Sequence, residues 1–168
     1  MDYELVSEDF SKRKIAFNKA YDEEFDPQSA AWTGRANKGL PDCTEFTYGE
    51  AVVLHFVAAL EYVGLKAGET FWDIGCGAGI PNMAASIFFP DIKVSKGVEL
   101  IDELYNLAID CQKIGTQAID EAGLTQAPLE YFLGDMFKID WSDADVIYIS
   151  NLCFPVELTV QVSHQAEK

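Results

Sequence analysis

Apolar residues follow two different patterns along this chain, and the two patterns alternate from Tyr48 onward. Between Tyr48 and Gly64 the apolar positions return every three or four residues, which predicts an amphipathic helix that stops at the glycine. Later apolar runs are short and lack a helical period, as expected of buried strands. These predicted strands are Thr70–Ile74, Lys93–Leu100, Leu129–Leu133 and Val146–Ser150.

Helical segments separate the predicted strands and follow the last of them. They are expected at about Pro81–Phe89, Ile101–Glu121 and Pro155–Lys168. Strands that alternate with helices pair in parallel through right-handed crossovers. We therefore expect an α/β fold with a Rossmann-like doubly wound parallel sheet, whose ligands bind at the carboxyl ends of the strands.

The residues before Tyr48 carry weaker patterns. Residues 7–21 place apolar side chains among charges at loosely helical spacing, and residues 26–47 are rich in Gly, Pro, Asn and Asp, which predicts a loop. We expect an N-terminal helical and loop extension over residues 1–47 and a Rossmann-like domain over residues 48–168.

Composition limits the ligands, partners and cellular location that we expect. The chain has 168 residues, 12 basic and 28 acidic, for a net charge of −16. Such a charge disfavours direct nucleic-acid binding and suits a cationic ligand or a basic protein partner, although it also serves solubility alone. No apolar run reaches the ~20 residues of a membrane span and no signal peptide begins the chain, so we expect an intracellular protein of the cytoplasm or nucleus.

The cysteines are scattered and form no CxxC pair. That spacing argues against a structural zinc site and against a disulfide framework, so we expect no metal and four reduced thiols. The four are Cys43, Cys76, Cys111 and Cys153.

A glycine-rich loop follows the first predicted strand. Gly75, Gly77 and Gly79 stand where this strand turns into a helix, a place where the backbone bends sharply and a ligand approaches without meeting a Cβ atom. Glu99 ends the second strand about 20 residues further on, as the acid that binds ribose hydroxyls does in nucleotide-binding folds. The context therefore predicts a site for a nucleoside-containing cofactor, and Cys76 belongs to its loop.

Two residues distinguish between a dinucleotide and S-adenosylmethionine. Ile80 occupies the position where a GxGxxG dinucleotide motif needs its last glycine. Asp73 precedes the first glycine by two residues, where a carboxylate is poorly placed beside a pyrophosphate but well placed near a sulfonium and an ammonium group. S-adenosylmethionine is therefore the expected cofactor, and a nicotinamide-dependent oxidoreductase is disfavoured.

The third strand ends in a further candidate contact. Asp135 could accept a hydrogen bond from the adenine amino group while Met136 covers the ring, or Asp135 could cap the strand end. Methyl transfer needs alignment of a nucleophile and exclusion of water more than it needs side-chain chemistry. His55 and His164 both lie away from these motifs in the sequence, so we assign no general base.

The motifs together resemble one family, the non-SET histone-lysine methyltransferases (the disruptor-of-telomeric-silencing family). The resemblance covers about residues 47–154, and its more specific parts are the upstream YGE and the fourth strand that ends in SNLCF. The motifs that carry it are Tyr48-Gly49-Glu50, the segment Phe71–Gly79, Gly97-Val98-Glu99, Gly134-Asp135-Met136-Phe137 and the segment Trp141–Phe154.

The resemblance implies a role for each matching position. Tyr48 and Glu50 would approach the methionine end of S-adenosylmethionine together with the Asp73 loop, and Glu99 would bind the ribose. The family places an asparagine at the methyl-transfer channel, where this chain has Ser150 followed by Asn151. The implied catalytic positions are Ser150, Asn151 and Tyr48, and the implied cofactor-binding positions are Tyr48, Glu50, Asp73, Gly75, Cys76, Gly77, Gly79, Glu99, Asp135 and Met136.

Two functional hypotheses follow. The first is a protein-lysine methyltransferase that acts on a basic protein substrate. The second is a reduced module that binds S-adenosylmethionine without catalysis and acts through a partner, because the predicted sheet stops after its fourth strand whereas a full methyltransferase sheet has about seven. A truncated gene product, a fragment that forms a homodimer through the exposed sheet edge and a reduced fold all stay open as explanations of that edge.

Overall fold

The computed structural model describes residues 7–21, 25–40, 48–49 and 52–167. None of the described helices has the length and apolar character needed to cross a membrane. The described elements are, in order, α1 (Glu8–Ala20), α2 (Pro27–Lys38), α3 (Val53–Val63), β1 (Thr70–Ile74), α4 (Ile80–Phe88), β2 (Val94–Glu99), α5 (Asp102–Glu121), β3 (Leu129–Leu133), β4 (Val146–Tyr148) and α6 (Val156–Ala166).

The strands form a parallel sheet in the order β3-β2-β1-β4. The chain winds outward from β1 to β3 and then returns to the other side of β1, so the order reverses between β1 and β4. Asp73 at the end of β1 lies in register with Gly97 on β2 and with Tyr148 on β4. The predicted Rossmann-like α/β fold is thereby confirmed, and the reversal lies where such folds bind their ligands. Within the described part of the chain, β4 pairs with β1 alone.

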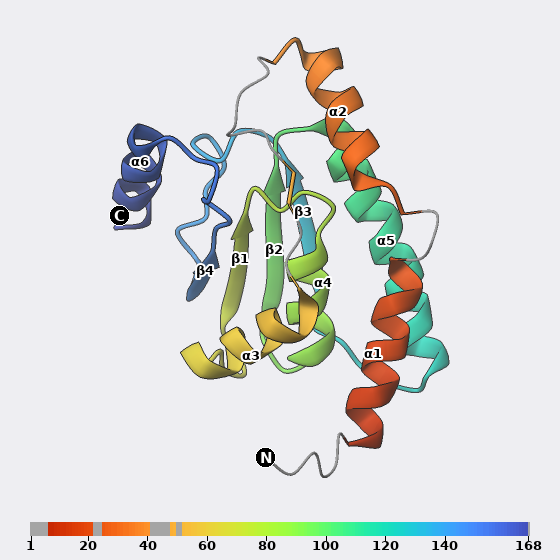
Figure 1. Cartoon of the computed structure of the whole chain (residues 1–168). Helices are drawn as coiled ribbons and strands as arrows, with labels where there is room; N and C mark the ends of the chain where they lie inside the picture. Colours follow the sequence, from red (N-terminus) through yellow and green to blue (C-terminus); the bar gives the residue numbers. More distant parts are fainter. Residues whose placement is uncertain (1–6, 22–24, 41–47, 50–51, 168) are drawn as a thin grey trace.

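One face of the sheet carries the helices that form the main core. Figure 1 shows α3 and α4 against the sheet, with α1 and α5 beside β3 and α6 on the opposite side beyond β4. Phe17 of α1, Phe56 of α3, Met83 of α4 and Ile119 of α5 are all buried in the same apolar cluster with Phe71 of β1. The four helices are therefore held on β1 by a shared core.

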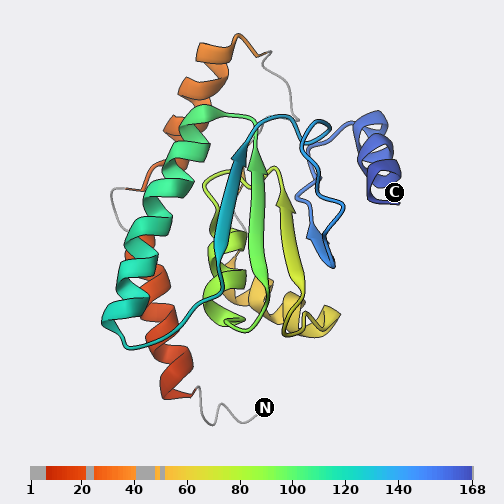
Figure 2. The same ribbon diagram turned by 180° about the vertical axis from the view of Figure 1, so that it is seen from behind.

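The other face is covered differently. Seen from behind, no helix lies in front of β1, β2 and β3 (Figure 2). Trp72 is nevertheless 1% exposed, because its indole stacks on Phe132 with ring centroids 5.3 Å apart and packs with Trp141. The indole nitrogen donates to Asp143, whose other carboxylate oxygen lies 2.6 Å from the Lys96 ammonium. The segment after β3 thus covers this face without forming a helix.

Helix α1 is fixed to the sheet by a buried cation. Arg13 is 8% exposed, and its guanidinium donates to the carbonyl oxygens of Ile87 at 2.5 Å and Thr125 at 2.8 Å. Its Nε also pairs with Asp9 one turn earlier at 2.7 Å. A buried arginine with satisfied donors strongly constrains the position of its helix, so α1 packs firmly against the rest of the described fold. The division of the chain at residue 48 stays a prediction.

The loop predicted over residues 26–47 is wrong for its first part, which forms α2. The Asp26 carboxylate caps the helix by accepting from the Ser29 N–H at 3.0 Å, Pro27 occupies the first turn, and Gly39 ends it in the left-handed conformation (φ +62°). These are ordinary start and stop signals. Glycine and asparagine content misled the prediction, because Gly34 lies in the contact with α5, where a Cβ atom would meet Ile101 and Glu103. Residues 41–47 lie outside the described residues.

Candidate active site

The loop after β1 is held by the neighbouring strand. All five residues of β1 are buried, which fixes the point at which the loop begins. The N–H groups of Gly75 and Cys76 both donate to the Val98 carbonyl at 2.9 Å, and the Gly77 N–H donates to the Glu99 carboxylate at 2.8 Å. Three successive backbone donors are thus directed at the end of β2. The loop is a preformed structure that leads into α4.

Glycine is required at the three loop positions for different physical reasons. All three have positive φ, a conformation that costs other residues energy. At Gly77 a Cβ atom would lie 2.7 Å from the Tyr48 ring, and at Gly79 it would clash with the Tyr131 hydroxyl, which donates to the Gly79 carbonyl at 3.2 Å. At Gly75 it would meet no described atom within 4 Å, so this glycine faces open space.

Glu99 holds the glycine loop through hydrogen bonds to its buried carboxylate. Its side chain is buried, and each carboxylate oxygen accepts one backbone N–H at 2.8 Å, from Gly77 and from Ile101. Burial raises the pKa of Glu99, while these backbone hydrogen bonds oppose the rise because they stabilise the charged form. A carboxylate has about four acceptor sites, so hydrogen-bonding capacity for a ligand hydroxyl remains.

Asp73 is the least satisfied polar group of the site. It is 2% exposed, and its Oδ2 atom has no hydrogen-bond partner in the part of the chain that is described. Burial, and secondarily the nearby Glu99 charge, hold the pKa of Asp73 well above its usual range. An uncompensated buried carboxyl is costly, and such groups cluster at functional sites.

Asp135 lies at the end of β3 in the capping geometry that the sequence left open. Its Oδ1 accepts from the Phe137 N–H at 3.0 Å, and its Oδ2 lies 3.5 Å from the Lys138 ammonium. The Met136 carbonyl accepts from the Trp141 indole at 2.8 Å, which fixes this turn. Both side chains line the same cavity as Asp73 and Glu99, so capping and ligand contact are compatible here.

A cavity of about 410 Å³ opens over the carboxyl ends of the strands. Its described lining includes three carboxyl groups, those of Asp73, Glu99 and Asp135, and it includes no Lys, Arg or His. Cys76 lines it as a protonated thiol, since burial raises the pKa of that side chain well above its usual range. The cavity is therefore large enough for a small organic ligand and suited to one that carries positive charge.

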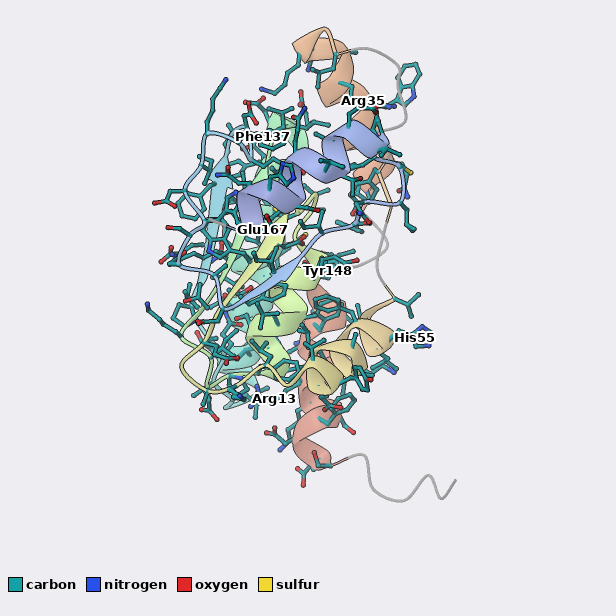
Figure 3. The ribbon with its side chains drawn as sticks, turned by 90° about the vertical axis from the view of Figure 1, so that its left-hand side faces the viewer. Arg13, Arg35, His55, Phe137, Tyr148 and Glu167 are labelled. Atoms are coloured by element: carbon teal, nitrogen blue, oxygen red, sulfur yellow. The ribbon has the colours of Figure 1, made fainter. Side chains whose placement is uncertain are left out.

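The structure adds aromatic and apolar residues that sequence reasoning missed. Tyr148, Phe154 and Leu158 line the cavity from the β4–α6 side. The Tyr148 ring packs edge-on against Phe56 with centroids 5.0 Å apart, and Figure 3 shows it on the side of the sheet that faces α3. Burial and then Asp73 raise the pKa of Tyr148, while a hydrogen bond from Ser150 opposes the rise. The aromatic residue two positions before Ser150 was the signal, because alternate strand residues share a face.

The three predicted catalytic residues do not all line the same cavity. Tyr48 and Ser150 line the main cavity, whereas Asn151 lines a different groove between β4 and α6. Glu50 lies outside the described residues. His55 is exposed on α3 and points outward (Figure 3), and neither it nor His164 lines the cavity. The register places Ser150, not Asn151, beside the three carboxyl groups.

The sequence matches a known family over most of its length. The model of the family described as "Histone methylation protein DOT1" matches residues 35–167. The chain belongs to this family. The matched region of this DOT1-family chain includes the whole glycine loop, Glu99, Asp135 and Ser150, so every described residue of the candidate site lies within it.

Solved structures support the fold of this DOT1-family chain. One is magnesium protoporphyrin IX methyltransferase from Synechocystis PCC 6803, crystallised with bound S-adenosylmethionine. It is 15% identical to this chain with a TM-score of 0.53, and the match covers 99% of this chain and 74% of the Synechocystis chain. A putative S-adenosylmethionine-dependent methyltransferase from Methanococcus maripaludis is 16% identical with a TM-score of 0.50 and covers 86% and 60%. Both share the class I methyltransferase fold, whose cofactor is S-adenosylmethionine.

An RNA methyltransferase from Salinibacter ruber, in complex with S-adenosylhomocysteine, is 25% identical with a TM-score of 0.42 and covers 61% of this chain and 59% of its own. The chain thus spans about three-fifths of the Salinibacter and Methanococcus structures. No curated protein matches the sequence significantly.

Proposed function

We propose that this chain is an S-adenosylmethionine-dependent methyltransferase that acts on a lysine side chain of a basic protein. The observation that carries the proposal is the chemistry of the cavity wall, where the described lining has three acidic side chains and no basic one. Such a site favours a cationic cofactor and an amine acceptor over a phosphate-bearing one. Membership of the DOT1 family and the class I fold support the same assignment.

The residues present fit S-adenosylmethionine. The unpartnered Asp73 oxygen offers an acceptor to a cationic group, and the open space at Gly75 admits a ligand against the backbone. Glu99 retains acceptor sites for ribose hydroxyls, and Asp135 with Met136 would lie at the adenine. When bound, the cofactor supplies a methyl group on a sulfonium that is already activated.

The cavity wall on the side of β4 suits the methyl acceptor. Tyr148, Ser150 and Phe154 line the cavity on the side of β4, opposite the second strand and its Glu99. The Tyr148 and Ser150 hydroxyls would accept hydrogen bonds from an amine and orient its lone pair, while Phe154 and Leu158 exclude water. A lysine ammonium must first lose one proton to solvent, because only the neutral amine has the lone pair that accepts the methyl group. These residues would then align the amine, and none of them is assigned as a dedicated base.

Charge also sets the expected partners. With a net charge of −16, the chain favours a basic protein substrate and disfavours direct contact with a nucleic-acid backbone. We propose that the protein works inside the cell, in the cytoplasm or nucleus, and that a second copy of the chain covers the β4 edge.

A labelled methyl-transfer assay tests the function. The purified chain is incubated with methyl-labelled S-adenosylmethionine and free core histones, and lysine methylation is read by mass spectrometry of the digested products. Histones whose lysines have been acetylated serve as the matched acceptor control, and total RNA as the alternative acceptor. Label in unmodified histones alone supports the proposal; label in RNA, or equal label in acetylated histones, contradicts lysine as the acceptor.

A second candidate is a binding module that retains the cofactor site without catalysis. The observation that favours it is the position of Asn151, whose side chain lines the separate groove by α6 and leaves Ser150 without an amide at the cavity. This module would bind S-adenosylmethionine in a calorimetric titration and leave all three acceptors unlabelled.

A further inference from the structure

The polar groups around Asp73 leave it without compensation in the described structure. Its Oδ2 atom is buried and unpartnered, while both oxygens of the neighbouring Glu99 are already engaged by backbone N–H groups. No Lys, Arg or His lies among the described residues of the cavity wall, and the Lys38 charge, which lowers the pKa of Glu99 from outside the wall, has no such effect on Asp73. The positive charge that would balance an ionised Asp73 must therefore come from the ligand.

The titratable groups that face Asp73 from the surrounding elements reinforce this imbalance. Each of them is an acid: Glu99 from β2, Cys76 from the glycine loop, Tyr131 from β3 and Tyr148 from β4. Helix α4, which also packs on β1, contains no titratable residue. The Glu99 charge thus favours the neutral form of Asp73, and the thiol and the two phenols, which are acids, supply no positive charge that would favour its ionised form.

We propose that Asp73 distinguishes the methyl donor from its spent product by giving up its proton to solvent when the donor binds. The proposal rests on the function proposed above and concerns the same cavity. S-adenosylmethionine carries a sulfonium, an ammonium and a carboxylate, for one net positive charge, whereas S-adenosylhomocysteine is a thioether with no net charge. Binding of the donor adds the missing cation, and the Asp73 carboxyl ionises in exchange; loss of the sulfonium charge after transfer returns the proton.

The consequence for affinity follows from linkage. A ligand whose binding releases one proton gains about tenfold in affinity per pH unit, for as long as the free protein holds that proton. The raised pKa of Asp73 extends this range upward from the ordinary carboxyl range. The donor's affinity should therefore rise with pH more steeply than the product's, so the pocket prefers the donor increasingly as pH increases.

Calorimetric titration of the full chain measures the proton directly. S-adenosylmethionine and S-adenosylhomocysteine are titrated separately from about pH 5.5 to about pH 8.5, in pairs of buffers that differ in ionisation enthalpy. The dependence of heat on buffer gives the number of protons released. We expect up to one proton for the donor, fewer for the product, and a ratio of their affinities that rises by up to about tenfold per pH unit.

Two variants locate the proton. Asp73→Asn retains the shape of the neutral side chain, and we expect it to lose the difference in proton release between the two ligands. Asp110→Asn, at an exposed residue of α5 paired with Lys113, is the matched control and should behave as the unaltered chain does. If Asp73→Asn does not fold, equal proton release by the two ligands in the unaltered chain still overturns the role of Asp73.

The outcomes separate the two claims. Equal proton release by donor and product, or undiminished release in Asp73→Asn, overturns the role of Asp73 while leaving cofactor binding intact. Absence of donor binding in every buffer overturns the proposed function itself, and this inference with it.

Discussion

Glu99 and Gly77 are joined by a hydrogen bond of 2.8 Å that runs from the backbone N–H of the glycine loop to a buried carboxylate at the end of β2. The bond spans 22 residues of sequence and links two of the segments that line the cavity. Because the other Glu99 oxygen holds Ile101 at the entrance to α5, one side chain fixes the loop and the following helix together.

Glu99→Gln should therefore disturb both structure and binding. An amide retains one acceptor oxygen and presents a donor where the other N–H already points, so one buried N–H loses its partner. We expect a loss of about 1–3 kcal/mol in the free energy of unfolding and at least about tenfold weaker S-adenosylmethionine binding. Urea unfolding and calorimetry measure the two effects. Glu130→Gln, at an exposed position of β3, should change neither, and an equal effect there would remove the explanation.

Gly75→Ala should separate binding from stability. The residue has φ +83°, and a methyl group there would meet no described atom within 4 Å, so the change carries a backbone cost of about 1–2 kcal/mol without a clash. The methyl would project into the cavity and obstruct the ligand. Gly64→Ala is the matched control, since it has φ +79° and equally open space but lies outside the cavity. Similar unfolding curves with binding lost in Gly75→Ala alone is the expected result.

The stability of the ligand-free chain should depend on pH through Asp73. Because the pKa of this carboxyl is raised on folding, the folded state keeps a proton that the unfolded chain loses near pH ~3.9, so the free energy of unfolding falls as pH rises above that value. Asp73→Asn removes this dependence. Its stability advantage over the unaltered chain should grow between about pH 5 and about pH 8, at no more than about 1.4 kcal/mol per pH unit. An advantage that shrinks with pH would contradict the assignment; Asp110→Asn serves as control.

Tyr148→Phe should lower methyl transfer without weakening cofactor binding. The substitution keeps the ring against Phe56 and removes the hydroxyl that interacts with Ser150. We expect about a tenfold decrease in kcat, since one orienting hydrogen bond is lost. Tyr62→Phe, at a ring that is 92% exposed on α3, is the matched control. A fall in cofactor affinity of the same size would show that Tyr148 acts on the donor instead.

Arg13→Leu should destabilise the fold far from the cavity. The change leaves the carbonyl groups of Ile87 and Thr125 without their donor and removes the pair with Asp9, which predicts a loss of about 2–4 kcal/mol. Figure 3 shows Arg13 at the end of the molecule remote from Phe137 at the cavity. Cofactor affinity of the folded fraction should remain unchanged. Lys14→Leu, at the exposed neighbouring position, tests whether loss of charge alone has this effect.

The central part of the fold was predictable because its residues act locally. The buried run of β1, the glycine triplet and the start of α4 each follow from the chemistry of consecutive residues. Composition predicts a loop over residues 26–47, whereas Asp26, Pro27 and Gly39 mark the ends of helix α2 within that range. Local start and stop signals were the better evidence.

The site was less predictable where it depends on neighbours in space. Whether Ser150 or Asn151 faces the cavity is decided by how the chain leaves β4, and a shift of one residue reverses the answer. Tyr148 enters the site because β4 pairs with β1 in register with Asp73. The unpartnered Asp73 oxygen could not be foreseen, since it reflects what the surrounding elements leave unpaired.

The contacts of Arg13 also bear on how the chain is made. Helix α1 is synthesised before every strand of the sheet, and the two carbonyl partners of Arg13 lie 74 and 112 residues later. During translation α1 cannot make both of these hydrogen bonds until the segment that contains Thr125 has left the ribosome. By then β1, β2 and the glycine loop have emerged, but β3, β4 and the cavity residues from Gly134 to Leu158 have not. The N-terminal helix can therefore make its buried contacts on the growing domain before the second wall of the ligand pocket exists.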